Sequence, residues 1–177
     1  MAIKNFSSIG GFAVGSTEVL DTDYALKNIS AMHMISDRFA DANKDTYIMK
    51  ATTSAALNTN QLSLDGSQSI ATNSAALAND TVSFVTARIF GQETTTNTYV
   101  YASQFEVIVT TDSSGNSTVA STYENVIRQN LPGQEEWSVT PDPFKIGANP
   151  FFTFEVASVT SSSTVKWIGI LEITVVS

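Results

Sequence analysis

Residues 165–176 read Val-Lys-Trp-Ile-Gly-Ile-Leu-Glu-Ile-Thr-Val-Val, and this stretch indicates the class of fold. Every second residue belongs to an apolar set that comprises Val165, Trp167, Gly169, Leu171, Ile173 and Val175. A repeat of two residues is typical of a β-strand that turns one face to a core. The opposite face is also partly apolar and carries Lys166, Ile168, Ile170, Glu172 and Thr174. We therefore expect a strand that is central in its sheet or covered on both sides, with Trp167 buried.

The same alternation occurs upstream. One face of residues 103–110 carries Ser103, Phe105, Val107 and Val109, and the segment ends at the turn sequence TDSSGNS, with Gly115-Asn116 at its tip. Phe152, Phe154 and Val156 alternate with more polar or smaller residues in the same way. Further strands are expected at 61–65, 82–90 and 118–123, whereas residues 134–143 read as a loop that two prolines close. Short strands separated by turns predict an all-β fold, either an antiparallel β-sandwich or a jelly roll.

Composition excludes several classes of protein. Of the 177 residues, 42% are hydrophobic, which is enough for a core, and 15% are charged, which is low for a helical bundle. The net charge is −8 and the nine Lys and Arg residues form no cluster, so we expect no nucleic-acid binding. The absence of cysteine excludes disulfides and thiolate zinc sites. No apolar run approaches the ~20 residues of a membrane span, and residues 1–12 lack the apolar run of a signal peptide.

Three zones are expected along the chain. Residues 1–50 are interpreted as an extended N-terminal arm, residues 51–80 as a connecting segment and residues 81–177 as the β-sandwich domain. Within the arm, residues 12–14 and 17–20 read as two extended pieces, and the spacing of Ile29, Met32, Ile35 and Phe39 predicts one short helix. The arm is too thin to bury its own apolar side chains. It therefore needs a partner surface, either another copy or another protein.

Tests for catalytic and metal-binding patterns favour structural roles. His33 is the only histidine, and its place between two methionines favours packing over catalysis. Asp41, Asn43 and Asp45 resemble the start of a calcium loop, but the sixth position is Thr46 instead of Gly and the twelfth is Thr52 instead of Glu. A solvated acidic turn is the preferred interpretation. We therefore expect no catalytic residue, no cofactor and no metal.

One aromatic residue has carboxylates close to it in sequence. Glu135, Glu136 and Asp142 flank Trp137, which is a pattern compatible with a glycosidase or a sugar-binding platform. A loop with a core tryptophan and solvent-facing acids is the preferred interpretation. The alternative kept open is a receptor- or carbohydrate-binding module that uses Trp137, Tyr99 and Tyr101 at the tip of the sandwich.

Two stretches resemble structural proteins of tailed bacteriophages. Residues 14–21, VGSTEVLD, and residues 26–29, LKNI, are similar to short segments of phage fibre proteins, with Leu20 where isoleucine is more usual. Residues 80–92, DTVSFVTARIFGQ, residues 101–121 and the final strand with Lys166-Trp167 resemble the terminal β-domains of phage virion proteins. The resemblance implies a virion structural protein, either a head decoration or a fibre, that is commonly trimeric.

The sequence and the resemblance together define the expected role. We expect a non-enzymatic homo-oligomer, a trimer, that is assembled in the host cytoplasm and resides in the virion. Residues 1–50 would attach it to capsid or tail proteins, and residues 81–177 would face outward. A host surface glycan is the further partner that the binding alternative implies.

Overall fold

The computed structural model describes residues 12–14, 17–20, 31–36, 39–67, 70–95, 98–131, 136–159 and 163–176. The chain divides into two compact units, Met1–Ser30 and Ala31–Ser177. In the first unit, β1 (Phe12–Val14) and β2 (Thr17–Leu20) pair antiparallel. This pairing confirms the two extended pieces expected from the sequence.

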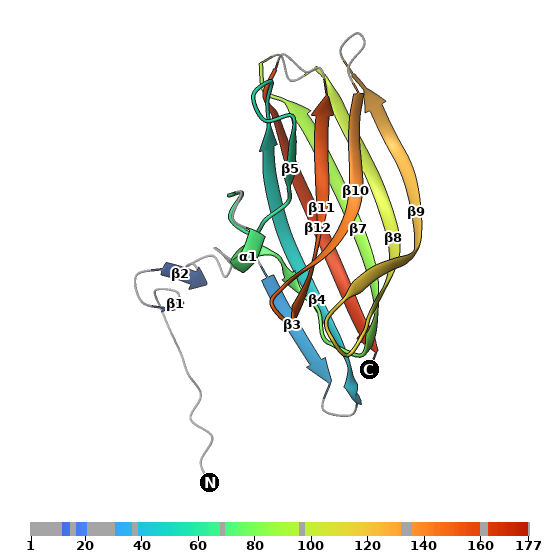
Figure 1. Cartoon of the computed structure of the whole chain (residues 1–177). Coiled ribbons are helices and arrows are strands. Elements are labelled where there is room, and N and C mark those ends of the chain that lie inside the picture. Colours follow the sequence, from blue (N-terminus) through green and yellow to red (C-terminus); the bar gives the residue numbers. More distant parts are fainter. Residues whose placement is uncertain are drawn as a thin grey trace. The chain divides into compact units, whose positions relative to one another are not determined.

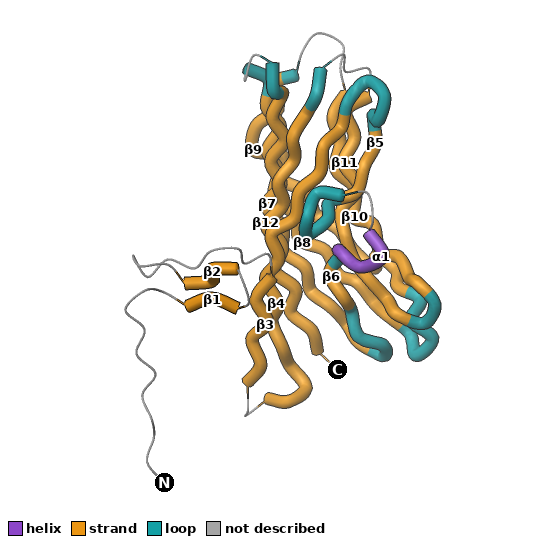
Figure 2. The backbone as a smooth tube through the Cα atoms, turned by 90° about the vertical axis from the view of Figure 1, so that its left-hand side faces the viewer, coloured by secondary structure: helices purple, strands orange, loops and turns teal. Residues whose placement is uncertain are grey.

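The second unit is an antiparallel β-sandwich, whose two layers are drawn in Figure 1 and separate in the view of Figure 2. The large sheet has the order β3 (Ala31–Ser36), β4 (Phe39–Thr53), β12 (Val165–Val176), β7 (Thr81–Glu93), β8 (Val100–Thr111), β9 (Ser117–Asn130). The small sheet has the order β10 (Glu136–Ile146), β11 (Asn149–Val159), β5 (Thr59–Gln61), and β6 (Ala75–Ala76) also pairs with β11. A single helical turn, α1 (Ile70–Asn73), precedes β6. The predicted all-β sandwich is thereby confirmed.

Strand β12 occupies a central position in the large sheet. It pairs along its whole length with β4 on one side and with β7 on the other. The predicted inner face is buried, and Trp167 is 1% exposed. The inner face of β8 is buried as well, and the turn after it contains Gly115 with a φ of 78°. The strands expected at 82–90, 103–110 and 165–176, the position of β12 and the burial of Trp167 were therefore predicted correctly, whereas the strand expected at 61–65 ends at Gln61 as part of β5.

Trp167 requires a glycine on the neighbouring strand. Gly91 of β7 stands directly opposite Trp167, and a Cβ atom built on Gly91 would lie 2.6 Å from the indole ring. The indole also makes edge contacts with Tyr101 and Trp137, with ring centroids 5.9 and 5.7 Å apart. The glycine thus provides the space that lets a tryptophan lie flat on the central strands.

The two sheets are joined by ring packing and by one buried polar group. Phe105 of β8 contacts Phe154 of β11 across the core, with ring centroids 5.0 Å apart. Thr53 of β4 accepts hydrogen bonds from the Trp167 indole N–H at 2.9 Å and from the Ser158 hydroxyl at 2.7 Å. These three side chains come from both sheets and are buried, so their hydrogen bonds fix the alignment of the layers.

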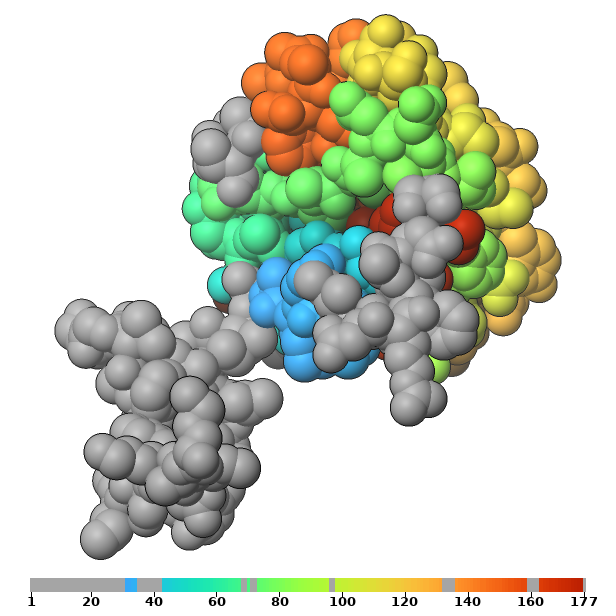
Figure 3. Space-filling view, turned by 90° about the horizontal axis from the view of Figure 1, so that it is seen from below, coloured from blue at the N-terminus to red at the C-terminus, as the bar shows by residue number. Residues whose placement is uncertain are grey.

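At the end of the sandwich that holds the turn between β8 and β9, turns from both sheets meet. Asp112 accepts hydrogen bonds from the Asn116 side-chain amide at 2.7 Å and from the backbone N–H groups of Asn116 and Ser114 at 2.8 and 2.9 Å, and these bonds lower the pKa of its carboxyl. The Lys145 ammonium donates to the Asn116 amide oxygen at 2.5 Å, and Figure 3 shows the yellow and orange segments side by side. The hairpin β8–β9 is thereby tied to the hairpin β10–β11.

Two local expectations were wrong. Residues 31–36 and 39–53 form β3 and β4 instead of a helix, because alternating Met32 and Met34 pair opposite Thr46 and Lys44. Residues 136–146 form β10 instead of a loop. Its two prolines are tolerated because β10 is an edge strand, where a missing N–H breaks no bond to a further strand.

The structure also divides the chain at a different place from the boundaries expected at 50 and 80. Residues 31–177 form one unit, since β4 pairs with β12, and β5 and β6 pair with β11. Residues 31–80 therefore supply strands to both sheets.

The contact between Gly91 and Trp167 predicts a specific energetic coupling. Gly91→Ala should lower the free energy of unfolding by about 1–3 kcal/mol, because the methyl group overlaps the indole ring. In a Trp167→Leu background the same change should cost less, with a coupling on the order of 1–2 kcal/mol. Urea denaturation of the four chains measures both values. Equal costs in the two backgrounds would contradict the contact.

Candidate binding surface on the large sheet

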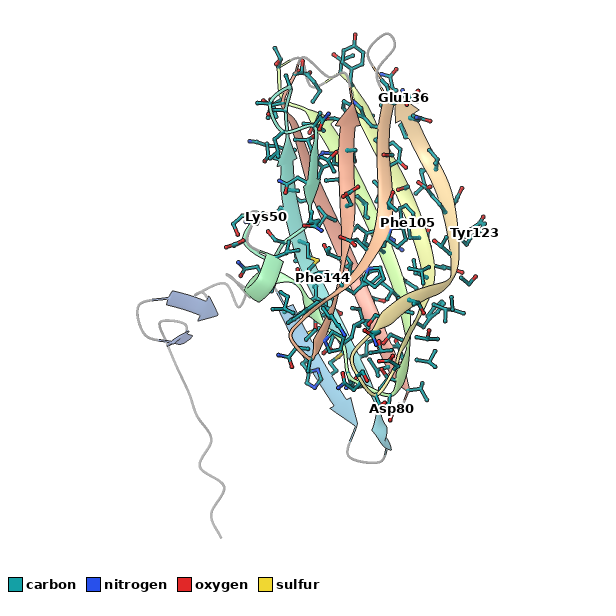
Figure 4. The ribbon with its side chains drawn as sticks, in the orientation of Figure 1. Lys50, Asp80, Phe105, Tyr123, Glu136 and Phe144 are labelled. Atoms are coloured by element: carbon teal, nitrogen blue, oxygen red, sulfur yellow. The ribbon has the colours of Figure 1, made fainter. Side chains whose placement is uncertain are left out.

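The outer face of the large sheet, which points away from the small sheet, carries most of the exposed apolar surface. Fourteen large hydrophobic side chains are exposed among the described residues, and the strand register places eleven of them on this face. They are Met32, Met34, Ile48, Val82, Phe84, Phe90, Ile108, Tyr123, Ile168, Ile170 and Val176. Figure 4 shows the contrast between Phe105, which lies between the sheets, and Tyr123, which projects from β9. We call this surface the outer face.

The apolar residues of the outer face form patches toward the two ends of the central strands. The first patch surrounds Ile168, which stands opposite Phe90 and next to the pair formed by Ile170 and Ile48. The second patch surrounds Phe84, which stands opposite Ile108. Val82 and Val176 extend this second patch as a cross-strand pair. Cross-strand neighbours of this kind have Cβ atoms about 5 Å apart, so each patch is continuous.

A polar band separates the two patches. Glu172 forms an ion pair with Lys44 at 3.0 Å across β12 and β4. Arg88 and Glu106 lie on the adjacent strands β7 and β8, opposite Gln104 and Thr86 respectively. Neither has an ion-pair partner among the described side chains. The band therefore offers one cation and one carboxylate that are available to a partner.

The first patch contains a hollow of about 500 Å³. Phe90 and Ile168 contribute its apolar lining, and Lys50, Lys166 and Asp65 contribute charges. The backbone at Ser63 bonds to that of Lys50 in both directions, at 2.8 and 3.0 Å, so the loop with Asp65 lies beside β4. Asp65 accepts hydrogen bonds from Ser67 and Asn73, and the bonds from Ser67 lower the pKa of its carboxyl.

The outer face differs in charge from the rest of the protein. Its four central strands present four of the nine Lys and Arg residues of the chain, which are Lys44, Lys50, Arg88 and Lys166. They present two of the 17 Asp and Glu residues, Glu106 and Glu172. A chain with a net charge of −8 thus has a face that is basic as well as apolar. Glu106 and Glu172 supply carboxylates on the same face, which therefore carries charges of both signs.

His33 lies in β3, and Asp41, Asn43 and Asp45 lie in β4 instead of in the expected acidic turn. His33 on β3 contacts the Asp45 carboxylate of β4 through Nδ1. Burial, and then the Asp45 charge and hydrogen bond, raise the pKa of Tyr47 to about 12. Residues 41–45 lie within strand β4, so their backbone is extended and does not form the tight loop of a calcium site.

The residues expected for sugar binding lie in the core. Trp137 and Tyr101 are both 3% exposed, and the Tyr101 hydroxyl donates to the Glu124 carboxylate. The preferred interpretation of Trp137 as a core residue is confirmed, although it lies in a strand. The carbohydrate-binding alternative in its predicted form is wrong, because two of its three aromatic residues are inaccessible to a sugar.

The carboxylates near Trp137 also lie apart. Glu136 and Asp142 are six residues apart on strand β10, which corresponds to about 20 Å. The paired carboxylates of glycosidases are about 5–10 Å apart. Asp142 accepts a hydrogen bond from the Gln61 amide at 2.5 Å, which is a contact between β10 and β5. Glu135 lies outside the described residues.

The described part of the chain has neither a metal-binding cluster nor a membrane-spanning helix. Its His, Asp and Glu side chains form no group of three or more that could hold a metal ion. None of its helices has the length and apolar character needed to cross a membrane.

The sequence contains a partial signal for the outer face, in the apolar residues of the second face of residues 165–176. The second face of residues 165–176 was recognised as partly apolar, because Ile168 and Ile170 follow each other at a spacing of two. The matching residues Ile48, Phe84 and Phe90 come from other strands. Their alignment with Ile168 and Ile170 depends on strand order, which the sequence alone does not reveal.

Comparisons with known proteins give weak structural likenesses. Neither a protein-family model nor a curated protein sequence matches the chain. The tailspike protein gp49 of the Acinetobacter baumannii bacteriophage Fri1, a capsular polysaccharide depolymerase, is 19% identical, with a TM-score of 0.40. The likeness covers 81% of this chain and 19% of that one. The tailspike protein of Acinetobacter baumannii phage AM24 is 11% identical, with a TM-score of 0.29, over 73% of this chain and 26% of that one.

Both likenesses are to phage tail proteins, which agrees coarsely with the expected virion protein. One of them contradicts the expectation of a non-enzymatic chain. The Fri1 tailspike is a depolymerase, so the non-enzymatic assignment is withdrawn. That assignment relied on the lack of sequence motifs, whereas active sites gather residues from separate strands. The match is weak and covers a small part of each tailspike, and it assigns no activity in place of the earlier one.

The burial of both tryptophans predicts the fluorescence of the protein. Trp137 and Trp167 are the two tryptophans of the chain, and they are 3% and 1% exposed. Acrylamide and iodide should therefore quench the native protein several-fold less than N-acetyltryptophanamide, and unfolding in urea should remove the protection. Strong quenching of the native protein by iodide would show that Trp137 is accessible and would restore it as a sugar-binding candidate.

Proposed function

We propose that this chain is a tail-associated structural or binding protein of a bacteriophage particle. Residues 1–30 attach it to another virion protein, and residues 31–177 form the body that faces outward. The attaching segment is shorter than the 50 residues expected from the sequence, because residues 31–50 contribute β3 and most of β4 to the sandwich.

The division of the chain at residue 30 is the observation that carries this proposal. The unit 31–177 contains a core that both of its sheets bury, so it has what it needs to fold alone. The unit 1–30 contains a two-stranded hairpin, and a hairpin of this size is marginally stable by itself in water. A short segment that is ordered by a partner suits attachment.

The sequence of the first unit supports the same division of roles. The segments that resemble phage fibre proteins, residues 14–21 and 26–29, both fall within unit 1–30. The resemblance therefore concerns the segment to which we assign attachment. The stretches that resemble terminal β-domains lie in the other unit.

Two finer roles remain as variants of the proposal, a head decoration and a tail fibre or spike. Their copy numbers differ, because decoration proteins cover a capsid in hundreds of copies and fibres are present in few. Quantitative mass spectrometry of purified particles, with the major capsid protein as internal standard, distinguishes the two. Either copy number agrees with a virion protein.

Removal of residues 1–30 tests the attachment role. The fragment 31–177 should be soluble and β-rich by circular dichroism, with a melting temperature within a few degrees of the full chain, since its sheets are intact. Phages whose gene encodes only this fragment should yield particles that lack it. Particles that carry the fragment at normal copy number would show that the sandwich is the anchor. Absence of the full chain from wild-type particles would contradict the virion assignment itself.

A further inference from the structure

We propose that the outer face of the large sheet is covered by a second copy of this chain. The face is an interface between copies, and the apolar patches around Ile168 and Phe84 are its contact regions. The burial, strand register and charges of this face support the interface. It stands whether or not the protein belongs to a phage particle.

The amount of apolar surface is the first argument. Eleven large side chains that are each about half exposed present on the order of 900 Å², given the ~150–250 Å² of a whole aromatic side chain and less for an aliphatic one. Each partner in a standard protein interface buries ~800 Å². The two patches together thus reach the area of a complete interface, with the polar band between them.

The distribution of the exposed residues is the second argument. Only Val126, Ile127 and Ile146, among the fourteen exposed large hydrophobic side chains of the described residues, lie away from the outer face. Apolar residues scattered singly over a surface need no explanation, whereas concentration on one face of a sheet indicates a partner.

The sequence of β12 gives the third argument. Its residues are apolar on both faces, as in strands that are covered on both sides. The small sheet covers the inner face, and Trp167 is buried there. On the opposite face, Ile168 and Ile170 remain 49% and 45% exposed in the single chain. A second copy supplies the cover that this pattern requires.

The charges of the polar band are compatible with a copy of the chain as the partner. The polar band carries Arg88 and Glu106, which are of opposite sign and two residue pairs apart on β7 and β8. They have no ion-pair partner among the described residues. When two such faces pack with their strands aligned, patch meets patch and band meets band. Arg88 of one copy then meets Glu106 of the other, so the face complements itself.

Paired substitutions test the proposal. Ile168→Asp with Ile170→Asp places two carboxylates in the first patch without touching the core. The control is Ile146→Asp in the full chain, because Ile146 is 40% exposed, lies in a strand and is away from the outer face. Light scattering at micromolar concentration should give an oligomer for the wild type and for the control. The double variant should give a mass near the 19.0 kDa of one chain.

A second measurement covers the case in which the double variant fails to fold. The chain has no cysteine, so Ile168→Cys and Ile146→Cys each introduce a single thiol. Maleimide labelling of the native proteins should be at least tenfold slower at position 168 than at position 146, and equal in urea. Circular dichroism and the melting curve confirm that each variant is folded.

Three outcomes would overturn the proposal. They are a wild-type mass near 19.0 kDa at all concentrations tested, an unchanged oligomer in the folded double variant, and equally fast labelling of the two thiols in the native protein. A monomer whose thiol at position 168 becomes protected only when an anionic glycan is added would assign the face to a sugar instead.

Discussion

Strand β12 forms twelve residue pairs with β4 on one side and twelve with β7 on the other. The last strand of the chain is therefore inserted between strands that come from residues 42–53 and 82–93. The inner face of the sheet is aligned by this pairing, because it sets Trp167 opposite Gly91 and places the indole N–H next to Thr53. The contacts of the indole with Tyr101 and Trp137 then extend the alignment to β8 and to the small sheet. The sandwich cannot be completed before the C-terminal strand is in place.

Much of this architecture was accessible from local patterns. Alternation identified β8, β11 and β12, and the glycine-containing turn after β8 was recognised from its residue types. Such predictions succeed because the side-chain direction in a strand repeats every two residues, whichever strands become its neighbours. The same reasoning correctly identified Trp167 as buried.

The failures concern features that depend on neighbours far apart in sequence. Residues 31–36 have a spacing that suits a helix, but their pairing with β4 determines their structure. The loop expected around Trp137 is a strand because β11 pairs with it over its whole length. Asp41, Asn43 and Asp45 read as an acidic turn, although β4 is held straight between β3 and β12. The boundaries expected at 50 and 80 also differ from the structure, since composition does not show which strands a segment will pair with.

The candidate site follows from the same long-range constraint. The order of the strands brings Ile48, Phe90 and Ile168 together, and it gathers basic residues on one face of an acidic protein. A sandwich with one covered core and one uncovered apolar face is suited to assembly. We propose that the first thirty residues, which form a separate unit, serve for attachment.

Hydrogen exchange of the native full-length protein, followed by mass spectrometry of peptides, tests the central role of β12 most directly. The account predicts that peptides from 165–176 and from 82–93 exchange slowest, because their amides lie in the middle of the large sheet, and that peptides from the edge strand β3 exchange faster than either. Exchange of 165–176 as fast as that of β3 would contradict the insertion of β12 between β4 and β7.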